Sequence, residues 1–170
     1  MGIALCQRSL SNALQRLGLL VETQTLLMIT VLMGAPAAGK TTWVQKNKTG
    51  FEHIYSTELV RVDRELDVDY FMASIRAKAI SAAKNGKDII ADGTHTIGHH
   101  RGFWLAIAKR LEIESHLIVF DTALPVLIAG NRMRSHPCPD DVLLKHHKRM
   151  QIAKRIVDRE PWDSVQRLVR

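Results

Sequence analysis

From Met28 onward the chain alternates between short apolar runs and longer amphipathic stretches. Met28–Met33 is a compact apolar run that stops at Gly34, which is typical of a buried parallel strand. Apolar runs at 88–91 and 113–120 are each followed by an aspartate, and a shorter run covers 53–55. Helical spacing predicts helices from about 41, over 68–85 and 99–111, from about 124, and from 140 towards 157.

Strands that alternate with helices predict an α/β fold with a parallel sheet of about four or five strands, flanked by helices. In such sheets ligands bind at the carboxyl ends of the strands. The polar segment 131–139 separates the last two predicted helices and carries two arginines.

The first 27 residues stand outside this alternation. Leu10, Leu14 and Leu17 recur at helical spacing and predict a short amphipathic helix. The polar residues 22–25 interrupt any apolar span of about 20 residues that a membrane helix needs, and no small-residue cleavage site suits a secretory signal. We therefore divide the chain into an N-terminal extension, 1–27, and one domain, 28–170. The extension is either an appendage from an upstream start codon or a helix docked on the sheet.

The sequence between the first strand and the first helix matches the P-loop pattern G-x-x-x-x-G-K-[ST] in full. Glycines let backbone N–H groups close around phosphate oxygens, and the helix N-terminus adds a positive field. Lys40 is expected to pair with β- and γ-phosphate oxygens, and the Thr41 hydroxyl to ligate Mg²⁺. The chain is therefore predicted to be a P-loop NTPase fold that binds ATP and Mg²⁺ through Gly34, Ala35, Pro36, Ala37, Ala38, Gly39, Lys40, Thr41 and Thr42.

Composition narrows the class of protein further. The apolar fraction of 46% and the charged fraction of 24% are those of a soluble globular protein. Cys6 and Cys138 form neither a disulfide framework nor a metal-ligand spacing, which favours a cytoplasmic protein. Lysine plus arginine exceed aspartate plus glutamate by 24 to 17, and much of the excess lies between 132 and 170. This basic region predicts an anionic partner, either nucleotide phosphates or a nucleic acid, and neither a membrane nor an obligate protein partner is inferred.

Several motifs follow the P-loop in a characteristic order. The P-loop itself continues into Trp43, and Val119-Phe-Asp121, Asn131-x-x-Arg134 and Pro139-x-x-Val142-Leu143 come after it. Over about 28–150 this series resembles the phage-type polynucleotide 5′-hydroxyl kinase family, the kinase domain of polynucleotide kinase-phosphatases. The family's P-loop reads Gly-x-Pro-Gly-Ser-Gly-Lys-Ser-Thr-Trp. The resemblance implies transfer of the γ-phosphate of ATP to the 5′-hydroxyl end of a nucleic acid.

The resemblance also assigns residues on the acceptor side. The family's Asp-x-x-Arg after the second strand corresponds to Glu58 and Arg61. The family's aspartate is the general base for the 5′-hydroxyl, and its arginine contacts the acceptor phosphate. Glutamate adds one methylene, which is compatible with a shifted loop, a different acceptor or a weak enzyme. Asp63 is the second candidate for the base, and a surface ion pair between Glu58 and Arg61 is the alternative.

Two further positions match the family on the nucleotide side. Asp92 corresponds to the first residue of the family's Asp-Thr-Asn and is expected to hold the P-loop threonine or a water on Mg²⁺. Arg134 corresponds to the lid arginine, which resembles an arginine finger supplied in cis, so the resemblance implies that 131–139 is a short basic lid. The alternative for Arg134 is a solvent-exposed arginine on a loop. The family has another arginine four residues earlier, where this chain has Gly130. Either Arg132 takes its place, or the nucleotide is held more weakly.

These residues predict an ATP-dependent kinase that phosphorylates the 5′-hydroxyl end of DNA or RNA. The same P-loop and lid suit a small-molecule kinase for a nucleoside, a sugar or an antibiotic, and a non-catalytic ATP-binding module that regulates a partner is a third interpretation. The histidine pairs at 99–100 and 146–147 are not predicted to bind metal, because neighbours on a helix point about 100° apart.

Overall fold

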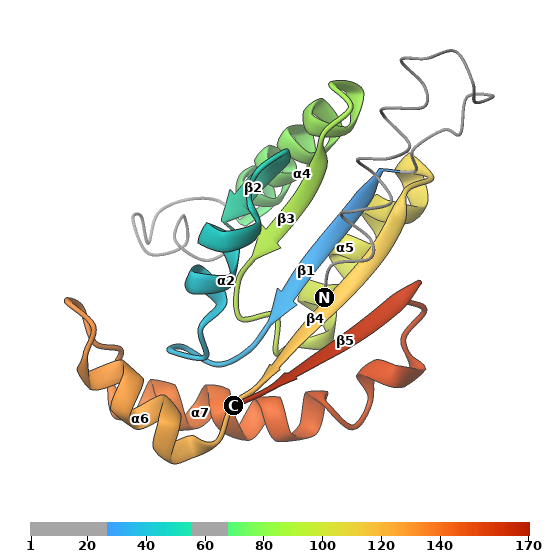
Figure 1. The fold of residues 1–170 in the computed structure, drawn as a ribbon. Coiled ribbons are helices and arrows are strands. Elements are labelled where there is room, and N and C mark those ends of the chain that lie inside the picture. The colour runs from blue at the N-terminus through green and yellow to red at the C-terminus, as the bar shows by residue number, and fades with distance from the viewer. Residues whose placement is uncertain (1–26, 56–67) are drawn as a thin grey trace, which may run out of the picture.

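A computed structural model describes residues 27–55 and 68–170, and its strands form one parallel sheet (Figure 1). The strands are β1 Met28–Met33, β2 Phe51–Tyr55, β3 Asp88–Asp92, β4 Glu114–Asp121 and β5 Ser164–Val169. The helices are α2 Lys40–Asn47, α4 Val68–Lys84, α5 Gly98–Leu111, α6 Leu124–Arg132 and α7 Asp140–Ala153, and a short 3₁₀ turn covers Val157–Arg159. The α/β class and the parallel sheet predicted above are confirmed.

The strand order is β2-β3-β1-β4-β5, so the strand that leads into the P-loop lies in the centre. β1 pairs with β3 on one side, in the register Ile29 to Ile89, and with β4 on the other, in the register Ile29 to Ser115. Because the strands are parallel, their carboxyl ends meet at one edge. That edge gathers the P-loop, the end of β3, the connection from β4 to α6 and the end of β5 (Figure 1).

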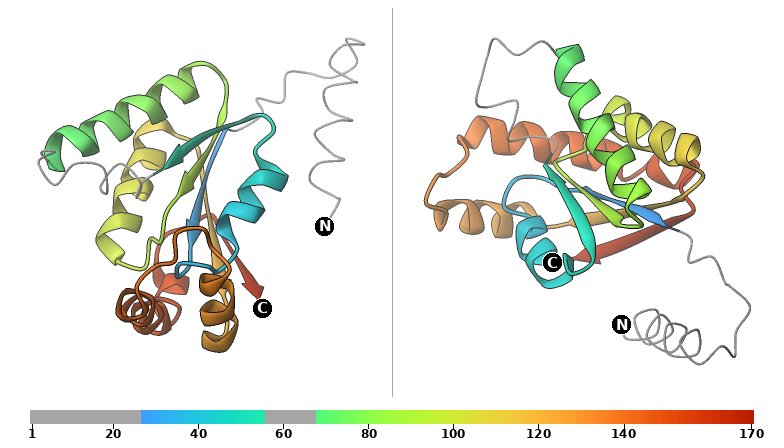
Figure 2. Two further views of the ribbon diagram at one scale, coloured as in Figure 1. Left: turned by 90° about the vertical axis from the view of Figure 1, so that its left-hand side faces the viewer. Right: turned by 90° about the horizontal axis from the view of Figure 1, so that it is seen from above.

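Helices cover both faces of the sheet and give three layers (Figure 2). On one face, Ile75 of α4, Trp104 of α5 and Met150 of α7 pack with alternate strand residues such as Val31 and Val119 in the larger core. On the other face a smaller core joins Leu32 and Ile118 to Val44 of α2, Leu127 of α6 and Leu143 of α7. The alternation of buried strand side chains between these two cores follows from the two-residue period of a β-strand.

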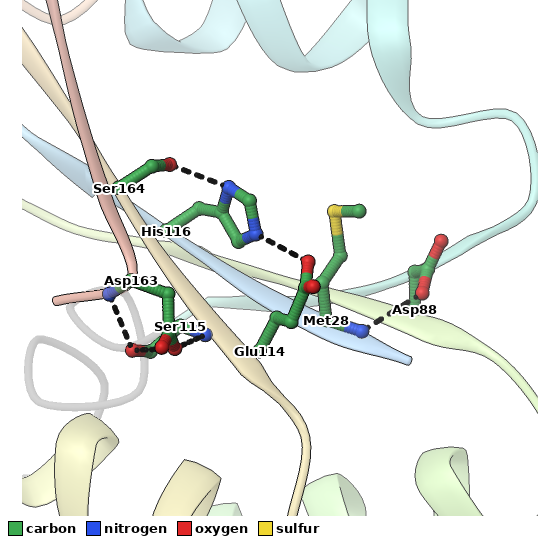
Figure 3. A network of polar contacts seen from close by, with 7 residues as sticks. All are labelled: Met28, Asp88, Glu114, Ser115, His116, Asp163 and Ser164. Atoms are coloured by element: carbon green, nitrogen blue, oxygen red, sulfur yellow. Dashed lines mark hydrogen bonds and ion pairs between the residues drawn. The ribbon is translucent and has the colours of Figure 1, made fainter. Parts of the chain in front are cut away.

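Polar contacts fasten the amino ends of the strands, at the edge opposite the P-loop (Figure 3). Asp163 Oδ2 accepts hydrogen bonds from the backbone N–H and the hydroxyl of Ser115, both at 2.7 Å, and these bonds lower the pKa of the Asp163 carboxyl. His116 bridges Ser164 of β5 and Glu114 of its own strand, at 2.7 and 3.0 Å. These contacts set the register in which β5 joins β4.

One helix end and one strand differ from the sequence-based expectation. The last helix ends at Ala153 rather than near Val157, and a 3₁₀ turn follows. Met150, Ala153 and Val157 are all buried at helical spacing, so the apolar period does not reveal the break. β5 lies in the C-terminal segment, for which no strand was predicted. Of the proposed N-terminal extension, residues 1–26 lie outside the described residues, and within 27–55 and 68–170 no helix is long and apolar enough to cross a membrane.

Candidate nucleotide and phosphoryl-transfer site

The P-loop begins where β1 ends, packed tightly between its neighbours. The backbone N–H of Gly34 donates to the Thr94 carbonyl at 3.0 Å, which ties the loop to the segment after β3. A Cβ atom added to Gly34 would lie 2.8 Å from Cβ of Phe120, closer than two such atoms approach. Gly39, just before α2, has φ 93, a left-handed conformation that favours glycine. Both glycines of the motif are therefore required by the backbone path.

Ala37 takes a conformation that L-residues avoid. Its φ is 63, and it occupies the position where the kinase family named above has its second P-loop glycine. A left-handed conformation costs an alanine about 1–2 kcal/mol. The chain therefore builds the phosphate-binding turn with strain at one residue, and packing around the loop has to hold that turn in place.

Lys40 folds over its own loop. Its Nζ donates to the carbonyl oxygens of Gly34 and Ala35, at 2.8 Å each. Burial lowers the pKa of Lys40 to about 8, while the charge of Asp92 raises this pKa and the charge of Arg134 lowers it further. The cause of the shift is desolvation, which an anion bound beside the ammonium would offset. The site is thus short of negative charge where a phosphate is expected.

Asp92 ends β3, the strand that pairs with the P-loop strand β1. It is 6% exposed, and its Oδ2 lies 3.2 Å from Nε2 of His53 on β2. The carboxylate therefore acts on Lys40 and contacts His53 at the same time. His53 orients Asp92 from the neighbouring strand, and the sequence offered no signal for it beyond a histidine in a short strand.

His95 packs under the P-loop and contacts the strand that leads into it. It is 2% exposed with φ 40; its Nδ1 lies 2.7 Å from the Leu32 carbonyl oxygen, and Trp104 Nε1 donates to its Nε2 at 3.0 Å. A carbonyl only accepts and an indole N–H only donates, so the ring is neutral with its proton on Nδ1. Burial lowers the pKa of His95 to about 4, and the bond to Leu32 offsets this in part. Arg101 Nη1 donates to the His95 carbonyl at 2.8 Å.

A buried ion pair joins Arg101, which contacts His95, to the segment before β5. Arg101 is 0% exposed, and its guanidinium donates to Glu160, with Nε 2.8 Å from Oε2. Trp162 Nε1 donates to the same carboxylate at 3.0 Å. Although burial raises the pKa of Glu160, its bonds to Arg101 and Trp162 outweigh burial and lower the pKa. The segment before β5 is therefore connected, through Arg101 and His95, to the floor of the P-loop.

The lid predicted from sequence is a short loop, residues 133–137, whose ends are clamped by one buried side chain. Asn131 is 2% exposed; its Nδ2 donates to the Cys138 carbonyl at 2.7 Å, and its Oδ1 accepts from the Cys138 N–H at 2.9 Å. The residues between are exposed, with Met133 88% exposed. Arg134 projects from this loop within electrostatic reach of Lys40, whose pKa it lowers.

Gly130 of α6 lies directly against the P-loop. A Cβ atom there would be 3.5 Å from the Ala37 carbonyl oxygen and 3.6 Å from Cβ of Ala37, an ordinary contact. The position where the kinase family has its other arginine therefore faces the phosphate-binding turn. Arg132 follows at the exposed end of the helix.

The remaining predicted residues divide into two groups. Thr41 and Thr42 are exposed in the first turn of α2, where backbone N–H groups point towards the P-loop. The hydroxyl of Thr41 and the carboxylate of Asp92 are oxygen donors of the kind that Mg²⁺ prefers, so these residues fit the predicted metal. Glu58, Arg61 and Asp63, the predicted acceptor-side residues, lie outside the described residues. Within 27–55 and 68–170 no group of three or more His, Cys, Asp or Glu could hold a metal ion.

The central P-loop strand, the parallel sheet and the flanking helices define a P-loop kinase-like domain, and this fold implies ATP binding. The chain belongs to the AAA domain family, whose profile matches residues 29–155. No curated protein sequence matches the chain significantly.

Solved structures with the same fold belong to proteins with different functions. A chain of the Pnkp1/Rnl/Hen1 RNA repair complex is 19% identical, with a TM-score of 0.63 over 79% of this chain and 47% of that one. This chain thus spans about half the length of the repair protein it matches. Chaetomium thermophilum Kti12, solved with ADP-AlF3, is 19% identical (TM-score 0.56, 83% of this chain and 88% of that one). A gluconokinase from Sinorhizobium meliloti is 14% identical (TM-score 0.54, 85% and 83%). At these identities the likeness shows the fold alone.

Proposed function

We propose that this protein is an ATP-dependent kinase that transfers the γ-phosphate to the 5′-hydroxyl end of DNA or RNA. The observation that carries the proposal is the position of Arg134, on a loop clamped by Asn131, where its charge acts on the P-loop lysine Lys40. A cation on a clamped loop within electrostatic range of the P-loop lysine is suited to stabilising a transferring phosphoryl group. The fold shared with a protein of an RNA repair complex is consistent with a nucleic-acid end as the acceptor.

The charges around the site favour an acceptor that itself carries phosphate. Burial lowers the pKa of His146 on α7, and the cations Arg149 and Lys40 lower it further. The pKa of His100 on α5 is lowered by burial, by His99 and by Arg149. α7 and the start of α5 therefore form a cationic group around Arg149, within electrostatic range of Lys40 through His146, in which protonation of the two histidines is disfavoured. A polyanion such as a nucleic-acid strand would offset this positive charge.

In this mechanism the chain positions charges and accepts one proton. Lys40 and the P-loop backbone hold the β- and γ-phosphates of ATP, and Arg134 stabilises the charge that spreads over the γ-phosphoryl oxygens. The acceptor hydroxyl oxygen bonds to the γ-phosphorus as the bond to the ADP oxygen breaks, and Glu58 takes the hydroxyl proton. Arg61 holds the acceptor phosphate by charge-assisted hydrogen bonds.

Mg²⁺ belongs to the proposal through Thr41 and Asp92. These two oxygen donors would hold the ion, which would neutralise part of the negative charge of the ATP phosphates. The chain's own contribution is to place the two oxygen donors, one at the start of α2 and one at the end of β3. His53 then fixes the orientation of Asp92.

A small-molecule kinase is the second candidate. It is favoured by the gluconokinase likeness, which covers 83% of that chain, whereas the likeness to the RNA repair protein covers 47%. This candidate shares the P-loop and lid but does not need the cationic group at α7 and α5. A nucleotide-binding module that transfers no phosphate is the third candidate. The Kti12 structure, solved with ADP-AlF3, shares the fold of this chain.

The test is incubation of the full chain with γ-labelled ATP and an oligonucleotide bearing a 5′-hydroxyl. We expect label on the oligonucleotide, and none with Lys40→Met or Glu58→Gln. Lys46→Met, on the exposed face of α2, is the matched control and should keep activity. Hydrolysis of ATP without transfer would favour the small-molecule candidate, and neither hydrolysis nor transfer would favour the binding module. Full activity of Glu58→Gln would contradict the base assignment, and Asp63→Asn would be tested next.

A further inference from the structure

Arg170 is held at the P-loop edge of the sheet by its backbone. Its N–H donates to the Asp121 carbonyl at 3.2 Å, and its carbonyl accepts from the Ala123 N–H at 3.1 Å. These two bonds continue the β4–β5 pairing by one residue, to the point where the chain turns into α6. The main chain of Arg170 therefore lies beside the connection that borders the P-loop, in a position fixed by the sheet.

The side chain of Arg170 reaches across to the P-loop itself. A Cβ atom added to Gly39 would lie 2.6 Å from Nη1 of Arg170, 3.3 Å from Cζ and 3.9 Å from Nη2. The guanidinium thus occupies the space that a side chain at position 39 would need. Gly39 directly precedes Lys40, so the Arg170 guanidinium lies against the residue next to the P-loop lysine.

The charge of this guanidinium has no protein counter-charge among the described residues. The ion pairs between described residues involve other cations. Asp121, whose backbone carbonyl accepts from the Arg170 N–H, has its carboxylate bound to Lys154 Nζ at 3.0 and 3.1 Å. Arg170 is also exposed, so its planar fork of N–H donors is open to a ligand. A guanidinium binds phosphate by paired, charge-assisted hydrogen bonds.

We propose that Arg170 is a phosphate-binding residue of the nucleotide site, which contacts the phosphate chain of bound ATP from the β5 side of the P-loop. Lys40 holds the phosphates from within the loop, Arg134 approaches from the lid, and Arg170 closes the site from the last strand. The proposal rests on nucleotide binding by the P-loop and not on the identity of the acceptor. A side chain at position 39 would displace this guanidinium.

The experiment measures binding with the full chain and no acceptor. Dissociation constants for ATP and ADP, and inhibition of ATP binding by inorganic tripolyphosphate, are compared for wild type, Arg170→Met and Arg170→Lys. Arg170→Met should weaken the binding of ATP, ADP and tripolyphosphate by a similar factor of about ten, as expected for a lost charge-assisted bond. Lysine should recover part of this loss. Arg159→Met, an exposed arginine of the 3₁₀ turn, is the charge-matched control and should bind like wild type.

Tripolyphosphate makes the result decisive because it has no base or ribose. Weaker ATP binding with unchanged tripolyphosphate binding would overturn the proposal and assign Arg170 to the nucleoside. Unchanged binding of all three ligands, or a wild type that binds none of them, would also overturn it. A wild type that binds ATP through Arg170 but transfers no label to a 5′-hydroxyl oligonucleotide would instead refute the proposed acceptor alone.

Discussion

Acidification is expected to destabilise this protein through His95. The buried ring lies between the Leu32 carbonyl and the Trp104 indole, both of which match the neutral form. Its pKa is about 4 in the folded protein against 6.5 in an exposed histidine. Between these values the unfolded chain binds more protons than the folded one, so the free energy of unfolding falls as pH drops below 6.5.

The size of the effect follows from the two pKa values of His95. Proton linkage gives a loss of about 2 kcal/mol between pH 7 and pH 5, and about 3 kcal/mol by pH 4, where the loss begins to level off. The lowered pKa values of His100 and His146 act in the same direction. A domain with a total stability of about 5–15 kcal/mol would feel such a change clearly.

Urea unfolding at a series of pH values tests this reasoning. The variant His95→Gln should be less stable than wild type at pH 7 but should lose about 2 kcal/mol less on going to pH 5. His136→Gln, an exposed histidine of the loop 133–137, should follow the wild-type slope. If wild type and His95→Gln lost the same free energy over this range, the buried neutral histidine would not be the source of acid sensitivity.

Three further substitutions, and a fourth that serves as a control, probe the parts of the site that rest on tertiary contacts. Asn131→Ala removes both bonds across the lid loop, so we expect a loss of about 2 kcal/mol in urea unfolding and a lower kcat in phosphoryl transfer. Gly34→Ala presses a methyl group against β4 and should cost about 1–3 kcal/mol and weaken ATP binding, whereas Gly130→Ala, in ordinary contact, should bind ATP normally. Glu160→Gln leaves the Arg101 guanidinium buried without a carboxylate, and thermal and urea unfolding should show a loss of about 3 kcal/mol.

β1, β3 and β4 could be predicted from sequence because each contains buried residues that form an apolar run, whereas β2 gave a shorter signal around the buried Ile54. β1 and β3 are almost wholly buried, and β4 alternates in its first half before its buried end. β5 shows no such run, because only Val165 and Leu168 are partly buried along an otherwise exposed edge strand. Its place is set by pairing with β4 and by the Asp163–Ser115 contact, which are interactions over 48 residues of chain.

The same distinction separates the predicted from the unpredicted site residues. The P-loop is local, and eight consecutive residues specify it, so the motif located it correctly. His53 lies in β2, His95 in the segment after β3 and Arg170 directly after β5. The role of each depends on a partner that is distant in sequence. Asn131 was visible as part of a motif, but its role as the clamp of the lid loop depends on the buried backbone of Cys138.

The C-terminal segment connects to the P-loop by two independent routes. Through Glu160 it holds Arg101, which holds the His95 carbonyl, and the adjoining Thr94 carbonyl anchors Gly34. Through β5 it carries Arg170 to the far side of the same loop. A strained turn at Ala37 needs support from outside the motif, because eight residues cannot hold an unfavourable backbone by themselves. The geometry of the P-loop is therefore a property of the whole sheet, including a last strand that the apolar pattern does not reveal.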